Sequence, residues 1–128
     1  MINPNIVIDK SFKISNKEIL NDYFLINQSR YLSYIGRKEV FMGRAKFGVF
    51  GDGKELPQVV MSKFFNNGDI RSGYYRDQTF MMAIDQLTPD QFFAQLYAHT
   101  DINKDPHSGG RQMNCHFGTR MLNNLGEW

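Results

Sequence analysis

The sequence lacks the features that mark disulfide-stabilised, secreted or membrane-spanning proteins. Its 128 residues include one cysteine, Cys115, which excludes an internal disulfide and a cysteine-based metal cluster. No apolar run approaches the ~20 residues that a helix needs to cross a bilayer. The N-terminus has neither the basic start nor the apolar stretch of a secretory signal. We therefore expect a cytoplasmic chain that has no membrane partner.

The sequence also has no large excess of positive or negative residues, because the formal net charge is only +2. That value allows an anionic ligand but does not indicate a polyanion. The basic residues that stand among aromatic ones, at 37–38 and 44–46, are therefore interpreted as a solvated or subunit-facing surface. No nucleic-acid partner is expected. The three histidines have no zinc-ligand spacing, and no Walker-type or Gly-x-Ser-x-Gly loop is present.

The chain does contain enough apolar material for one modest core, with 41% hydrophobic and 14% aromatic residues. Local patterns predict a mainly helical fold with a short strand. Ser15 and Glu18 have capping-box spacing, as do Thr88 and Gln91. The predicted elements are an N-terminal arm over 1–14, a long helix over 16–35 that stops at Gly36, an irregular glycine-rich loop over 41–56, a short helix around Pro57, a strand over 70–75, a helix over 78–86 and a helix from Pro89.

Tyr75 and Arg76 form the sharpest local feature, because they stand at the predicted strand end directly before a helix. The start of a helix offers unpaired amides and a partial positive charge. An arginine there adds a planar charged fork that matches phosphate oxygens, and a tyrosine hydroxyl adds a donor. Such a corner suits a diphosphate or a carboxylate, although an arginine in this position more often forms a surface ion pair.

Two spaced motifs change the interpretation of this corner. They are Gly73-Tyr74-Tyr75-Arg76-Asp77-Gln78 and Gly110-Arg111-Gln112-Met113-Asn114-Cys115-His116-Phe117-Gly118. In sequence and spacing they resemble the α subunit of thiamine-diphosphate-dependent 2-oxo acid dehydrogenases of the branched-chain (2-oxoisovalerate) type. The similarity runs over roughly residues 30–120. It implies that the chain is the N-terminal part of a thiamine-diphosphate-binding α/β/α fold, with residues 15–128 an incomplete domain.

The resemblance assigns roles to individual residues. Tyr75 and Arg76 occupy the places that hold the diphosphate of thiamine diphosphate. Arg111 and His116 belong to the loop beside the cofactor pocket, and His116 is the candidate catalytic residue. Phe41 matches a position that lines the acyl pocket, but the glycine-rich loop after it is longer than usual in the family, which leaves its assignment as a substrate-binding residue open.

The resemblance also implies magnesium, whose ligands we expect outside this chain. Thiamine enzymes hold the ion with a motif that begins Gly-Asp-Gly and closes with an asparagine. Here Gly51-Asp52-Gly53 comes before the other motifs instead of after them, so we interpret it as a turn. The metal-binding motif would then lie beyond Trp128, and this chain would be a fragment, a truncated product or one piece of a split enzyme.

The whole enzyme implied by the resemblance decarboxylates a 2-oxo acid oxidatively and passes the acyl group to a lipoyl arm. Its expected partners are the β portion of the dehydrogenase, which supplies the activating glutamate, and the lipoyl acyltransferase component, within an oligomer. This chain alone is expected to be inactive. Two alternatives stay open: the same chemistry on pyruvate or acetoin, and a small helical binding module without chemistry.

Overall fold

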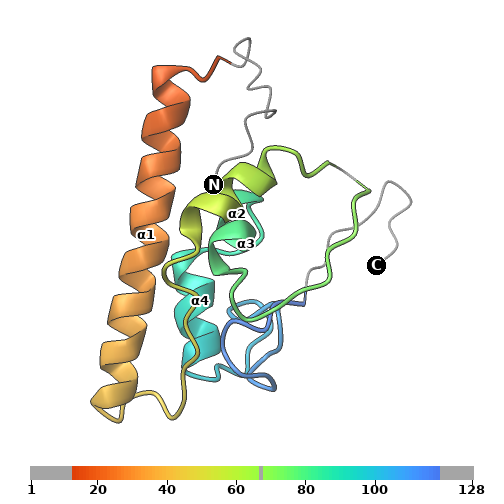
Figure 1. Ribbon diagram of the computed structural model, residues 1–128. Helices are drawn as coiled ribbons and strands as arrows, with labels where there is room; N and C mark the ends of the chain where they lie inside the picture. Colours follow the sequence, from red (N-terminus) through yellow and green to blue (C-terminus); the bar gives the residue numbers. More distant parts are fainter. Residues whose placement is uncertain (1–12, 67, 119–128) are drawn as a thin grey trace, which may run out of the picture.

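The computed structural model describes residues 13–66 and 68–118, and these fold as four α-helices joined by irregular loops. The helices are α1 (Asn16–Phe41), α2 (Glu55–Ser62), α3 (Gln78–Ala83) and α4 (Pro89–Leu96). α1 runs along one side of the molecule, and the three short helices lie beside it (Figure 1). The mainly helical prediction is confirmed. The predicted arm over 1–14 falls almost entirely outside the described residues.

Helix α1 begins where the sequence predicts and ends six residues later. Ser15 caps it by accepting a hydrogen bond from the Glu18 amide, at 3.2 Å. Gly36 does not stop the helix, so that part of the prediction is wrong. The glycine is instead buried inside the helix, where a Cβ would lie 2.5 Å from Cε1 of Phe50. Gly36 is therefore a point of close packing between α1 and the loop that follows it.

The three short helices confirm most of the local signals. Pro57 lies in the first turn of α2, as predicted. Thr88 and Gln91 form both hydrogen bonds of a capping box at the start of α4. Helix α3 ends at Ala83, three residues before the predicted end. There Asp85 takes a left-handed backbone conformation (φ 57°), and the Gln86 amide donates to the Met81 carbonyl at 2.8 Å.

The strand predicted over 70–75 does not form, and the described residues contain no strand at all. A strand needs a neighbour with which to exchange backbone hydrogen bonds. This segment instead runs as an extended loop in which Ile70 is 96% exposed. Its contacts are made by side chains: Arg71 forms an ion pair with Asp77, and the Tyr74 amide donates to Asp77 Oδ2 at 2.9 Å.

The hydrophobic core lies between the inner face of α1 and helices α3 and α4, and the loop that ends at Gly118 closes it. Phe80 and Phe92 are its largest fully buried residues. Their neighbours Phe65 and Phe93 pack edge-on against them, with ring centroids 5.1 and 5.2 Å apart. The edge-on geometry suits the aromatic quadrupoles and adds to the burial of area.

Three buried glutamines tie this core to the loops. Gln58, Gln78 and Gln95 are at most 8% exposed, and each forms hydrogen bonds to backbone groups far away in sequence. A glutamine side chain carries the same donor and acceptor as a peptide group. In a fold without a described sheet, these side chains make the long-range backbone connections that strands would otherwise make.

Candidate functional site

The two motif segments singled out in the sequence lie side by side. The Arg71 guanidinium donates to the Phe117 carbonyl at 3.0 Å, which joins the segment before α3 to the Gly110–Gly118 loop. Between them lies a cavity of about 360 Å³. Its lining comes from both segments and from one further histidine: Gly73, Tyr74, His107, Gln112, His116, Phe117 and Gly118. Residues almost 40 positions apart in sequence therefore share one cavity.

The Tyr75–Arg76 pair lies directly before α3, as expected from the sequence, but in a turn and not at the end of a strand. Arg76 Nε donates to the Tyr75 hydroxyl at 3.0 Å, and the guanidinium carbon lies 5.2 Å from the Tyr75 ring centroid. Tyr74 in turn packs against Tyr75, with centroids 4.3 Å apart. The side chain of Arg76 is exposed and forms no salt bridge within residues 13–66 and 68–118.

The backbone under Arg76 is held from two sides. The Arg76 carbonyl accepts a hydrogen bond from Gln58 Nε2 at 2.7 Å, while Gln58 Oε1 accepts one from the Phe80 amide at 2.9 Å. On the other side Gly51 is so close that a Cβ would lie 2.8 Å from the Arg76 carbonyl oxygen. These contacts fix the position of the turn from α2 and from the glycine-rich loop, so the exposed guanidinium stands on a rigid base.

Gly51-Asp52-Gly53, interpreted from the sequence as a turn, forms one. Asp52 Oδ1 accepts from the Arg37 guanidinium at 2.6 Å. The Gly53 amide lies 3.0 Å from both carboxylate oxygens of Glu55, which also accept two bonds from Arg30. Both carboxylates are thus used in structural contacts. Across the described residues, no group of three or more His, Cys, Asp or Glu side chains is arranged to hold a metal ion.

Asp105 organises residues 105–110, which lead into the Gly110–Gly118 loop. Its fully buried carboxylate accepts bonds from the amides of His107, Ser108 and Gly110 and from the Ser108 hydroxyl, at 2.6 to 3.2 Å. Burial raises the pKa of Asp105, but the bonds from Gly110 and Ser108 outweigh that effect, so the pKa lies below its ordinary value. Asp105 is therefore a charged anchor for the loop.

Gln95 and Asn114 hold the second half of the loop. Gln95 Oε1 accepts from the Cys115 amide at 2.7 Å, and Gln95 Nε2 donates to the His116 carbonyl at 2.9 Å. Asn114 forms a matching pair of bonds with the backbone of Val49, at 2.9 and 2.7 Å. The loop is consequently clamped between α4 on one side and the glycine-rich loop on the other.

His116, the candidate catalytic residue, lies half-buried in the wall of the cavity. Its Nδ1 is 3.2 Å from the Asn114 carbonyl, which favours the tautomer with a proton on Nδ1. In that tautomer Nε2 is left as the acceptor. His107 lies in the same wall, edge-on to Phe117 at 5.2 Å, and burial lowers its pKa. The cavity thus combines two imidazoles with the Gln112 amide.

Cys115 takes no part in the cavity surface. It is fully buried, and burial raises the pKa of its thiol to about 12. Its backbone has a positive φ of 62°, an unusual conformation for a residue with a side chain. The two bonds from Gln95 hold this conformation in place. The thiol is therefore a protonated group inside the core.

Of the residues that the resemblance assigned, only His116 lines this cavity; the lining does not include Tyr75, Arg76, Phe41 or Arg111. Phe41 is the last residue of α1, where it is 83% exposed and lies outside the lining of this cavity. The structure therefore does not bring Phe41 together with His116. Arg111 is exposed on the Gly110–Gly118 loop, at the rim of the segment that forms the cavity.

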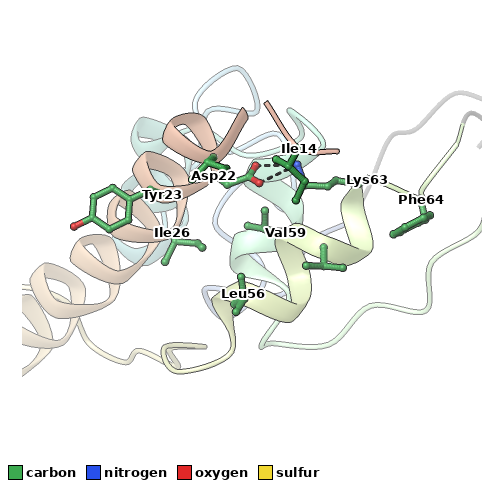
Figure 2. A pocket seen from close by; sticks show the side chains of 10 residues that line it. Ile14, Asp22, Tyr23, Ile26, Leu56, Val59, Lys63 and Phe64 are labelled. Carbon is green, nitrogen blue, oxygen red and sulfur yellow. Dashed lines mark hydrogen bonds and ion pairs between the residues drawn. The ribbon is translucent and has the colours of Figure 1, made fainter. Parts of the chain in front are cut away.

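A second, larger cavity of about 430 Å³ lies between α2 and the first half of α1. Its wall is almost entirely apolar and includes Ile26, Leu56 and Val59 (Figure 2). At one end Lys63 bonds to Asp22 and Glu18, at 2.9 and 2.6 Å. Those acidic partners raise the pKa of the Lys63 ammonium. No sequence pattern indicates this cavity, because its two walls come from separate helices, with Ile26 of α1 and Leu56 of α2 30 positions apart.

Comparisons with protein-family models, curated protein sequences and solved structures gave no match to this chain. None of the helices in the described ranges combines the length and apolar character needed to cross a bilayer. The candidate site therefore has to be interpreted from its own residues.

Proposed function

We propose that this chain is the diphosphate-side part of a thiamine-diphosphate-dependent 2-oxo acid dehydrogenase of the branched-chain type. The observation that carries the proposal is the meeting of the two motif segments at one cavity. The resemblance alone requires only that both motifs occur in the right order along the sequence. Arg71, two residues before the first motif, bridges the two by pairing with Asp77 and donating to the Phe117 carbonyl, and this bridge and the shared cavity are independent of that order.

The Tyr75–Arg76 corner fits a diphosphate in charge and in donor geometry. The Arg76 guanidinium is exposed, and only its Nε bonds to Tyr75. The two outer amino groups of the fork therefore point away from that bond and suit two phosphate oxygens. The Tyr75 hydroxyl accepts from Arg76 and keeps its own proton for donation. The rigid base under Arg76 reduces the entropy that would be lost on binding an anion.

The roles of the remaining residues follow from this placement. Thiamine diphosphate, with magnesium, would supply the carbanion chemistry of decarboxylation when bound. Tyr75 and Arg76 would hold the diphosphate, and His116 would present its Nε2 to a substrate carboxylate or a proton. The magnesium ligands, the activating glutamate and the rest of the α/β/α fold would come from outside the described residues. The acyl acceptor would be a lipoyl arm of the acyltransferase component.

Calorimetric titration of the natural gene product with thiamine diphosphate and magnesium chloride tests this proposal. The Arg76→Ala variant should bind the cofactor about 30-fold more weakly, because one charge-assisted contact contributes about 2 kcal/mol. Tyr75→Phe should cause a smaller loss. Lys104→Ala is the matched control, since Lys104 is an exposed cation on a neighbouring loop. Equal affinity in Arg76→Ala, with circular dichroism unchanged, would disprove the assignment of the corner.

Turnover measurements on the natural gene product, assembled with the β portion of the dehydrogenase, decide the substrate. Reduction of an artificial electron acceptor should be fastest with a branched 2-oxo acid, and His116→Ala should lower kcat more than cofactor affinity. Faster turnover with pyruvate or acetoin would keep the cofactor and replace the substrate. Phe41→Ala should change little, because the structure places Phe41 apart from the cavity.

A non-catalytic binding module is the second candidate, and the apolar cavity between α1 and α2 favours it. An amphipathic helix of another protein could place apolar residues against Leu56 and Val59. Absence of cofactor binding in the full gene product would support this candidate. Tight cofactor binding that depends on Arg76 would exclude it as the main function.

A further inference from the structure

The outer face of α1 carries an apolar stripe that no described element covers. The stripe consists of Leu20, Phe24, Tyr31, Tyr34 and Phe41, whose side chains are between 50% and 83% exposed. The inner face of the same helix is buried at 29, 32–33, 36 and 39. Tyr31, Tyr34 and Phe41 each stand two positions after a buried residue, so each lies about 200° around the helix axis from that buried residue. The stripe therefore lies opposite the core.

The spacing of the stripe is that of a coiled-coil seam. Along α1, steps of four and three residues alternate from Leu20 through Phe24, Asn27, Tyr31 and Tyr34 to Lys38 and Phe41. This 3.5-residue period keeps one line of side chains facing a partner helix. The Tyr31 and Tyr34 rings already pack edge-on, with centroids 6.3 Å apart. A seam with this period is complementary to another seam of the same period.

We propose that α1 pairs through this stripe with α1 of a second copy of the chain, in an antiparallel arrangement. The area agrees with a stable interface. Aromatic side chains bury roughly 150–250 Å² each when covered, so the stripe offers about 600–700 Å² per copy. Two copies would bury about 1,300 Å², within the standard range of ~1,200–2,000 Å². The inference does not depend on the proposed function.

Charge sets the antiparallel orientation. Lys17 and Lys38 are exposed and stand at seam positions near the two ends of α1. In a parallel pair each lysine would face the same lysine of the second copy, and the two positive charges would repel each other. In an antiparallel pair Lys38 lies opposite Leu20 of the second copy, and Phe24 lies opposite Tyr34.

Analytical ultracentrifugation of the 128-residue chain from about 1 to about 200 µM tests the pairing. A monomer–dimer equilibrium is expected. The double variant Phe24→Glu with Tyr31→Glu should raise the dimer dissociation constant at least 100-fold while its helical circular dichroism stays unchanged. The control is Leu56→Glu, which changes an equally exposed apolar residue in the cavity between α1 and α2. A monomer at the highest concentration, or a dimer dissociated by Leu56→Glu and not by the double variant, would overturn the proposal.

Cross-linking tests the orientation independently. The single native thiol, Cys115, is buried and will not interfere. A mixture of Leu20→Cys and Lys38→Cys chains should form a disulfide-linked pair under mild oxidation, whereas each variant alone should not. Self-linking of each variant alone would show a parallel pair and refute the antiparallel arrangement.

Discussion

Replacement of Gln95 by methionine should open the loop that lines the cavity without creating a void. Methionine keeps the length and most of the volume of glutamine but has no amide. The substitution removes two hydrogen bonds, one to the Cys115 amide and one to the His116 carbonyl. Both backbone groups are then left without these partners in a region where Gln95 is 1% exposed. Each unsatisfied buried group costs about 1–3 kcal/mol, so for the two groups we expect a loss of roughly 2–6 kcal/mol.

Cys115 reports this loss directly. It is the chain's only thiol, it is fully buried, and its pKa of about 12 keeps it protonated. Labelling by a thiol reagent must therefore wait for the loop to open. If opening becomes easier by about 2 kcal/mol, the labelling rate rises about 30-fold. Urea unfolding of the same variant measures the global part of the loss.

Gln28→Met is the matched control. Gln28 is half-buried on α1, and its side chain has no hydrogen-bond partner among residues 13–66 and 68–118. Its replacement should leave the labelling rate within about twofold. If Cys115 in the Gln95→Met variant is labelled as slowly as in the unchanged chain, Gln95 does not hold the loop and the argument from its two bonds fails.

Three further predictions concern stability. Gly36→Ala should lower the unfolding free energy, measured by urea unfolding, by about 1–3 kcal/mol, because the new Cβ would meet the Phe50 ring. This loss is expected although alanine favours helices more than glycine does. A stabilised variant would contradict the close packing of Gly36 against Phe50. Asp105→Asn should lower the unfolding free energy by about 2 kcal/mol at pH 7. It should also make the unfolding free energy depend less on pH in the acidic range. The lowered pKa of Asp105 means that its contribution is present above its ordinary value near ~3.9 and is lost as the pH falls through the folded value. The Arg44 guanidinium lowers the pKa of Glu39 to about 2, so the ionised Glu39 stabilises the fold above pH ~4, and this contribution is lost as the pH falls towards about 2. The Glu39→Gln variant should lack this pH-dependent contribution, which acid titration followed by circular dichroism measures. The same acid unfolding curve in the variant and the unchanged chain would show that Glu39 is not ion-paired in solution.

The sequence predicted the starts of the helices better than their ends. Starts are marked by local chemistry: Thr88 and Gln91 form both bonds of the expected capping box, and Ser15 accepts the expected bond from the Glu18 amide. Ends depend on contacts that the local sequence does not contain. Gly36 has the composition of a helix stop, but the Phe50 ring occupies the space where a side chain would be, and the helix continues. Tertiary packing overrides the local preference here.

The predicted strand over 70–75 failed for a related reason. Its aromatic residues have strand propensity, but propensity reflects packing on a sheet, and the described residues supply no sheet. The position of Tyr75 and Arg76 before a helix was nevertheless predicted correctly, because the apolar helical stretch that follows them forms α3 from Gln78. The apolar cavity and the clamp by Gln95 were missed. Each joins residues from separate elements, and neither leaves a local pattern.

The shortness of the helices explains why the side-chain amides of buried glutamines hold so many of the backbone segments around the site. α3 has six residues and α4 has eight, lengths at which an isolated helix is unstable in water. Their ends, and the loops beyond them, must be held by contacts from elsewhere. Gln58 supplies one such contact under Arg76, and Gln95 supplies another under His116. Substitutions at these two glutamines should therefore disturb the cavity more than substitutions of exposed loop residues that line it, such as Gln112.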